Sequence, residues 1–115
     1  MGNYRISLIV PIYGVERYIG KFAETALGQD AEGIQFIFVN DGTKDRSVQI
    51  LQELIDGKFS HLKTHITIIN KENQGLPLAR KTGLDHAEGE YVLFADSDDW
   101  LETDAVRKIL ARIDE

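Results

Sequence analysis

The sequence predicts an α/β fold in which a mostly parallel, Rossmann-like sheet carries helices on both faces. Two observations lead to this prediction. Four apolar, β-rich runs alternate along the chain with four segments whose apolar residues recur at helical spacing. Each apolar run also ends in polar or turn-forming residues. Strands that alternate with helices call for a parallel sheet with right-handed crossover connections.

The expected strands are short runs of β-branched, aromatic and other apolar residues. They cover residues 6–10, 34–39, 65–69 and 91–95. Pro11 ends the first strand, because proline cannot donate to a sheet ladder. The last run is apolar at all five positions, which predicts a strand buried on both faces.

Each expected helix has one apolar face. The first covers residues 17–27 and ends at Gly28. The second follows a cap at Thr43 or Asp45 and closes near Gly57. The residues that mark the third and fourth helices are Leu78, Ala79, Thr82 and Gly83, and then Ala105, Val106, Ile109, Leu110 and Ile113.

Composition limits the classes of function. The 115 residues are 43% hydrophobic, which suits one compact domain with its own core. The net charge of −6, with 19 acidic against 13 basic residues, argues against a nucleic-acid-binding surface. No cysteine is present, and no run approaches the roughly 20 apolar residues of a membrane span. We therefore expect a soluble, cytoplasmic chain, with membrane association of a full-length protein left open.

An acidic cluster directly follows the fourth expected strand. Asp96 and Asp98 can turn towards one point if the chain bends at Ser97, and Asp99 adds a third carboxylate. Three acids in four positions repel one another, so a divalent cation with oxygen ligands is one candidate to sit among them. The alternative is an N-terminal cap, with carboxylates at the positive end of the last helix.

The other strand ends would gather at the same edge of a parallel sheet. Residues 11–13, 40–43 and 73–75 all follow strands, and this edge is where open α/β sheets bind ligands. Asp41 is placed to accept hydrogen bonds from a base or ribose, and Gly42 allows close approach. An ordinary surface turn explains the Asn-Asp-Gly sequence equally well.

Four further residues bear on binding. Arg80 and Lys81 follow a glycine-containing loop into the third helix, which can present positive charge to phosphates, although a solvated helix face is the alternative. His61 and His65 are four apart, but their segment is typical of a loop that enters a strand, which argues against a metal site.

Taken together, four segments resemble the successive motifs of family 2 glycosyltransferases. They are Ser-Leu-Ile-Val-Pro-Ile-Tyr (7–13), Val-Asn-Asp-Gly-Thr (39–43), Asn-Gln-Gly with Ala-Arg (73–75 and 79–80), and Gly-Glu-Tyr through Asp-Ser-Asp-Asp (89–99). The resemblance implies a GT-A fold, a nucleotide-diphosphate sugar donor with UDP-sugar first, and a Mn²⁺ or Mg²⁺ ion. It also implies hexosyl transfer with inversion, as in polysaccharide biosynthesis.

The resemblance assigns roles to individual residues. Those expected to hold the base and ribose are Pro11, Ile12, Tyr13 and Asp41. Arg80 would lie near the nucleotide. Asp96 and Asp98 would form the D-x-D motif, which meets the ribose and the metal-bound diphosphate, with both acids as metal ligands.

The chain departs from the family pattern in two ways. The usual Asp-Asp-Gly-Ser is Asn-Asp-Gly-Thr at residues 40–43, and the chain ends about one helix after the D-x-D motif. The general base and the acceptor site are therefore expected beyond residue 115. We interpret residues 1–115 as the donor-binding N-terminal portion of a catalytic domain, inactive alone, with an unknown acceptor. The uncovered contact surface would favour a homodimer.

Two alternatives compete with this interpretation. A receiver-type signalling domain has a similar length and alternation. It would need acids after the first strand and a lysine after a fifth, whereas Pro-Ile-Tyr follows the first strand and a fifth is missing. A nucleotide-binding module without transferase activity shares the motifs and stays open.

Overall fold

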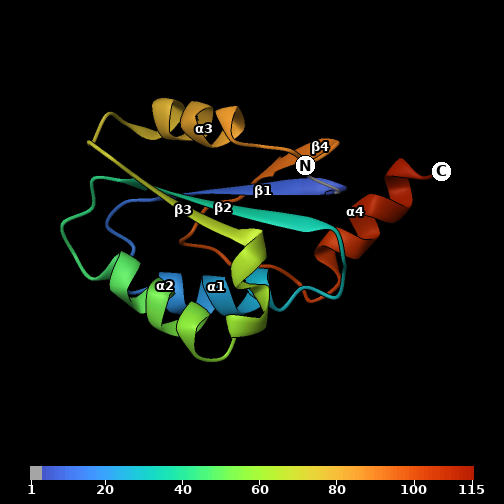
Figure 1. Ribbon diagram of the computed structural model, residues 1–115, viewed down its shortest axis with the longest axis horizontal. Helices are drawn as coiled ribbons and strands as arrows, with labels where there is room; N and C mark the ends of the chain where they lie inside the picture. The colour runs from blue at the N-terminus through green and yellow to red at the C-terminus, as the bar shows by residue number, and fades with distance from the viewer. Residues whose placement is uncertain (1–3) are drawn as a thin grey trace.

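A computed structural model describes residues 4–115 and shows a four-stranded sheet with all strands parallel. The strands are β1 (Ile6–Ile12), β2 (Ile34–Asp41), β3 (Ile66–Lys71) and β4 (Tyr91–Phe94). Their order in the sheet is β3-β2-β1-β4 (Figure 1). The predicted α/β fold with a parallel sheet is confirmed, and all four expected strands are present.

Helices cover both faces of the sheet. On one face lie α1 (Ile19–Leu27) and α2 (Ser47–Asp56), and on the other lies α3 (Leu76–Asp85) (Figure 1). A short 3₁₀ helix, η1 (Ser60–His65), precedes β3, and α4 (Ala105–Ile113) is the last element. None of the helices in the described part of the chain is long and apolar enough to cross a membrane.

The core has two parts because the sheet separates them. The larger part fills the space between the sheet and α1 and α2, around the fully buried Phe22 and Phe38. The smaller part lies under α3 and contains Ile9, Ile37, Val39 and Ala79. Every residue of β1 is buried, as expected for a central strand with helices on both faces.

The prediction that β4 is buried on both faces is wrong. Tyr91, Val92 and Phe94 keep 45%, 37% and 43% of their surface exposed. Among the described strands it pairs with β1 alone, over residues 91–94, and so forms an edge of the sheet. An apolar run shows that a strand has apolar surface to bury, but it does not show whether a neighbour covers that surface.

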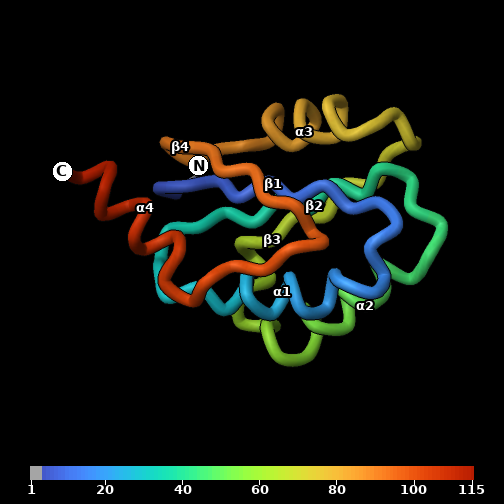
Figure 2. The backbone as a smooth tube through the Cα atoms, turned by 180° about the vertical axis from the view of Figure 1, so that it is seen from behind, coloured from blue at the N-terminus to red at the C-terminus, as the bar shows by residue number. Residues whose placement is uncertain are grey.

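The last helix does not cover the exposed side chains of β4. The connection after β4 runs back along α1 to the opposite end of the sheet, where α4 begins (Figures 1 and 2). Leu101 N donates to Thr25 Oγ1 at 3.0 Å, and Val106 N donates to Gln29 Oε1 at 2.9 Å. These bonds attach the segment to the end of α1, so α4 leaves the β4 edge open.

Close packing of α3 on the sheet generates a test of stability. A Cβ at Gly83 would lie 2.4 Å from Ile9 Cγ2, whereas a Cβ at Gly20 in α1 would lie 3.6 Å from Ile50 Cγ2. We expect Gly83→Ala to lower the free energy of unfolding by about 1–3 kcal/mol through overpacking. Gly20→Ala should leave it unchanged or raise it by up to ~1 kcal/mol, because alanine favours helix. Urea unfolding measures both, and equal stability of the two variants would contradict the packing.

Candidate functional site

The carboxyl ends of the strands surround a hollow of about 500 Å³. Its walls come from the ends of β1 and β2, the loops after β1, β3 and β4, and the start of α3, so segments far apart in the sequence meet there. The lining residues are Pro11, Tyr13, Val15, Asp41, Asn73, Gly75, Leu76, Ala79, Asp96, Ser97 and Asp98. Five of the residues predicted for the site therefore share one hollow. The side chain of Ile12 instead belongs to the large core and is fully buried.

Asp41, the last residue of β2, is only 3% exposed and holds the loop between β3 and α3. Its Oδ1 accepts from Gln74 N at 2.9 Å and from Lys71 Nζ at 3.2 Å. Its Oδ2 accepts from Gly75 N at 3.0 Å and from Asn73 Nδ2 at 3.2 Å. Four donors fill the roughly four lone-pair positions of a carboxylate. A hydrogen bond from a ligand would have to replace Lys71 or Asn73.

The same contacts keep Asp41 ionised. Burial by itself would raise the pKa of this carboxyl, but the bonds from Gln74, Lys71 and Gly75 outweigh burial and hold the pKa below its usual value. The ion pair with Lys71 is shielded from water, since the two side chains are 14% and 5% exposed. Asp41 is therefore a fixed negative charge that orders the loop opposite the acidic cluster.

The acidic cluster is attached to the sheet through the serine between its acids. Ser97 is 4% exposed, and its Oγ donates to the carbonyl of Pro11 at 2.8 Å. Asp96 and Asp98 are exposed on either side of it and line the hollow. The cap alternative is wrong, because α4 begins only at Ala105 and has Asp104 at its N-cap position.

Arg80 brings positive charge to these acids. Its Nη2 lies 3.6 Å from Asp96 Oδ1, and its guanidinium carbon lies 5.9 Å from the centre of the Phe94 ring. Within residues 4–115, the buried Nε of Arg80 has no hydrogen-bond partner. Lys81 instead pairs with Asp85 at 3.3 Å on the exposed side of α3. For Lys81 the alternative of a solvated helix face is therefore correct. Of the two basic residues predicted at the start of α3, only Arg80 lies at the site.

Comparison with models of protein families identifies the family of this chain. A model described as Glycosyl transferase family 2 matches residues 7–115. The chain belongs to glycosyltransferase family 2.

Two curated members of the family illustrate its relatives. The chain is 41% identical over 109 residues to "Glycosyltransferase GlyA" of Streptococcus pneumoniae serotype 4, covering 95% of this chain and 15% of the relative. It is 37% identical over 105 residues to "Putative glycosyltransferase EpsH" of Bacillus subtilis, covering 91% of this chain and 29% of the relative. The chain thus spans less than a third of the length of either relative.

Solved structures agree with the family and the GT-A fold. Staphylococcus aureus TarS 1–349 in complex with UDP matches with a TM-score of 0.83 and 31% identity, over 96% of this chain and 32% of that chain. A complex of the same TarS fragment with UDP-GlcNAc matches equally well. A mannosyltransferase from Pyrobaculum calidifontis in complex with GDP-Man and Mn²⁺ shares the fold, with a TM-score of 0.75 and 24% identity.

The carboxylates at the hollow suit a metal ion that takes its remaining ligands from a substrate. Among residues 4–115, no three His, Cys, Asp or Glu side chains are grouped to hold a metal ion. Mg²⁺ is usually bound through one or two carboxylates and completed by phosphate oxygens and water. The exposed oxygens of Asp96 and Asp98 on one hollow fit such an incomplete set.

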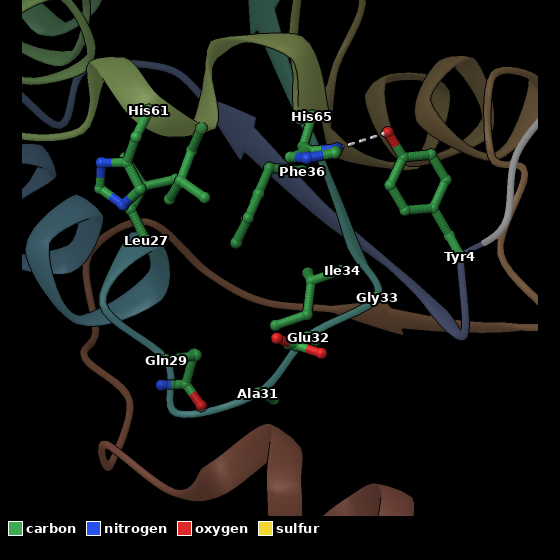
Figure 3. Close-up of a pocket in the computed structure, with 11 residues that line it drawn as sticks. Tyr4, Leu27, Gln29, Ala31, Glu32, Gly33, Ile34, Phe36, His61 and His65 are labelled. Atoms are coloured by element: carbon green, nitrogen blue, oxygen red, sulfur yellow. Dashed lines mark hydrogen bonds between the residues drawn. The ribbon is translucent and has the colours of Figure 1, made fainter.

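A second, larger hollow of about 660 Å³ lies at the opposite end of the sheet (Figure 3). Leu27, Ile34 and Phe36 form its apolar walls, and Tyr4 OH is 2.9 Å from His65 Nδ1 at its rim. It contains none of the residues predicted for the donor site. His61 and His65 lie in and at the end of η1, not in a loop, and share the hollow without a third metal-binding side chain grouped with them in the described chain.

Sequence reasoning misses the residues that support the site. It assigns no role to Lys71 and no contact to Ser97, although each bonds to a segment far away in the sequence. The sequence analysis treats Asp45 only as a helix cap. It does not predict that Asp45 contacts the loop after β1. A serine between two acids after a strand is a local signal that points to Ser97. The Lys71 and Asp45 contacts depend on tertiary structure.

Replacement of the buried carboxylate tests its structural role. We expect Asp41→Asn to lower the free energy of unfolding by about 1–3 kcal/mol at neutral pH, because an amide cannot accept from donors on both sides. The folded-state pKa of Asp41 is lowered, so its stabilisation is present above about pH 4 and is lost as pH falls through the folded-state value. The deficit of the variant should therefore shrink below pH 4. Urea unfolding at several pH values measures it.

Asp56→Asn is the matched control for this experiment. Asp56 is exposed and pairs with Lys63 at 2.9 Å on the surface of α2, so its replacement should change stability much less. Equal effects of the two substitutions at neutral pH would contradict the role of Asp41.

Proposed function

We propose that the chain is the donor-binding N-terminal portion, residues 1–115, of a metal-dependent glycosyltransferase catalytic domain. The reaction is transfer of a hexosyl unit from a nucleotide-diphosphate sugar, with UDP-sugar as the first candidate, to an acceptor. The observation that carries the proposal is the meeting of Asp41, Asp96 and Asp98 at one hollow in a family 2 domain. The UDP and UDP-GlcNAc complexes of TarS support the choice of nucleotide.

In this proposal the residues of the chain bind and orient the donor. The segment of Pro11 and Tyr13 forms one wall for the base and ribose, and Asp41 contacts the nucleotide by exchange with Lys71 or Asn73. Asp96 and Asp98 would hold a Mn²⁺ or Mg²⁺ ion, which would supply positive charge for the leaving diphosphate. Arg80 offers a second positive charge beside Asp96.

The transfer step itself needs groups that we do not assign to this chain. An inverting reaction requires a general base opposite the leaving group, and we place that base and the acceptor site in sequence beyond residue 115. The relatives are several times longer than the matched region, which is consistent with this division. We therefore propose that the 115-residue chain binds the donor and does not transfer the sugar. We place it in the cytoplasm, with membrane association of the full-length protein left open.

A nucleotide-binding module without transferase activity is the second candidate. It would bind the same donor with the same residues, so binding to the chain cannot separate the two. Incubation of the full-length parent with labelled donors and acceptors separates them. Transfer or donor hydrolysis that is lost in Asp98→Ala supports the enzyme, and its absence with intact binding supports the module.

Titration calorimetry of UDP into the chain, with and without Mn²⁺, tests the donor site. We expect binding that requires the metal and that weakens at least tenfold in Asp98→Ala, a loss of about 1.4 kcal/mol. Asp99→Ala is the matched control, because Asp99 belongs to the same cluster but does not line the hollow. Binding that is independent of the metal, or equal in both variants, would contradict the assignment of Asp98.

The open β4 edge supports self-association of the chain as a homodimer. Exposed apolar edge strands pair with other chains unless charges or covering segments prevent it. We expect light scattering to show a mass that rises with concentration, and Val92→Lys to return the chain to a monomer. Thr67→Lys, which adds the same charge on the opposite edge strand, is the control. A clean monomer at all concentrations would contradict the proposal.

A further inference from the structure

We propose that Asp45 is a positioning residue of the donor site, which fastens the loop after β1 to the start of α2. This loop, residues 13–18, carries Tyr13 and Val15 on the wall of the hollow. The inference rests on the proposed function, because it concerns the same site. Asp45 itself does not line the hollow, so it acts through the loop.

Three successive backbone amides of the loop donate to side chains near the start of α2. Gly14 N donates to Thr43 Oγ1 at 2.9 Å, and Val15 N donates to Ser47 Oγ at 3.1 Å. Glu16 N donates to Asp45 Oδ2 at 3.2 Å. In return, the backbone amide that follows Asp45 donates to Glu16 Oε1 at 2.7 Å. The two segments are thus joined in both directions.

Asp45 determines which way the two hydroxyl groups point. Thr43 Oγ1 and Ser47 Oγ donate to Asp45 Oδ1 at 2.7 Å and 2.5 Å. A hydroxyl has one hydrogen, so each then presents only lone pairs to the amides of Gly14 and Val15. The carboxylate therefore orients both acceptors as well as accepting directly from the loop.

A side-chain amide cannot replace this carboxylate in either orientation. If the amide oxygen of Asp45→Asn accepted from the hydroxyls, the NH₂ group would face Glu16 N, and two donors would oppose each other. If the amide were turned over, the hydroxyls would have to accept from it and direct their hydrogens elsewhere, towards the loop amides. Both arrangements lose hydrogen bonds to the loop.

The electrostatics of Asp45 agree with this geometry. Burial raises the pKa of Asp45, but the bonds from Ser47, Thr43 and Glu16 outweigh it and lower the pKa from 3.8 to about 2. The group is therefore ionised, and able only to accept, at any pH near neutrality. A loop that is already ordered binds a ligand without the loss of freedom that ordering would require.

The experiment compares Asp45→Asn with Asp56→Asn, which removes the same charge from the exposed surface of α2. A second pair of variants at Thr43 keeps the test valid if Asp45→Asn does not fold. Thr43→Val removes the hydroxyl that accepts from Gly14, and Thr43→Ser keeps it. Two quantities are measured for each variant: the dissociation constant for UDP in Mn²⁺, and the hydrogen-exchange rates of the Gly14, Val15 and Glu16 amides.

We expect Asp45→Asn and Thr43→Val to weaken UDP binding roughly tenfold and to speed exchange at the loop amides. Asp56→Asn and Thr43→Ser should leave both quantities unchanged. Unchanged exchange in Asp45→Asn would overturn the inference, and so would faster exchange with unchanged UDP affinity. If the wild-type chain bound no UDP, the proposed function would fail and the assignment of Asp45 to a donor site would fail with it. Faster exchange in that case would show a structural contact only.

Discussion

The arrangement of the hollow at the carboxyl ends of the strands depends on the buried carboxylate of Asp41. A charge with 3% exposure is tolerated only when donors replace its water, and four protein donors do so here. All four come from residues 71–75, the end of β3 and the loop that follows it. The same residues lead into α3, and α3 carries Arg80 and packs on Ile9. The charge at the end of β2 thus fixes the entry of the chain into the helix that covers the second face of the sheet.

The two acidic groups of the site differ in what their oxygens already contact. Asp41 is saturated by the protein, whereas Asp96 and Asp98 are exposed, and the ionic partner of Asp96 is Arg80 at 3.6 Å. The carboxylate of Asp41 stabilises its loop and can accept from a ligand only if a protein donor leaves, whereas the carboxylates of Asp96 and Asp98 have oxygens available to a metal ion or ligand. The buried Ser97 between the two exposed acids explains how Asp96 and Asp98 stay available to a ligand although their backbone is held in place. Its hydroxyl holds the backbone to β1 while both acidic side chains face the hollow.

The fold could be predicted further from the sequence than the site could. Residues 34–39 are apolar except for Gln35 and follow a helix, and the repeated alternation of such runs with helices indicates strands of a parallel sheet. The place of Asp96 and Asp98 at the carboxyl edge follows from the same alternation. The exposure of Phe94 does not follow from the alternation of strands and helices, because it depends on which strand neighbours β4 and where α4 packs. The partners of Asp41 lie about 30 residues away in sequence, and so does Glu16, the partner of Asp45 in the loop after β1. No local pattern encodes such hydrogen bonds.

Electrostatics explain why the proposed donor site calls for a cation. Asp96, Asp98 and Asp99 lie within four residues, and a nucleotide diphosphate would bring further negative charge to the same hollow. Arg80 is the base that lies against this cluster, while Lys71 is already paired with Asp41 at 3.2 Å. One guanidinium cannot balance three carboxylates and a diphosphate, and two like charges about 4 Å apart repel by about 1 kcal/mol even in water. A divalent ion held by Asp96 and Asp98 would supply the positive charge that this site lacks for an anionic donor. This balance of charge is the physical reason behind our proposal that UDP and Mn²⁺ bind together at the acidic cluster.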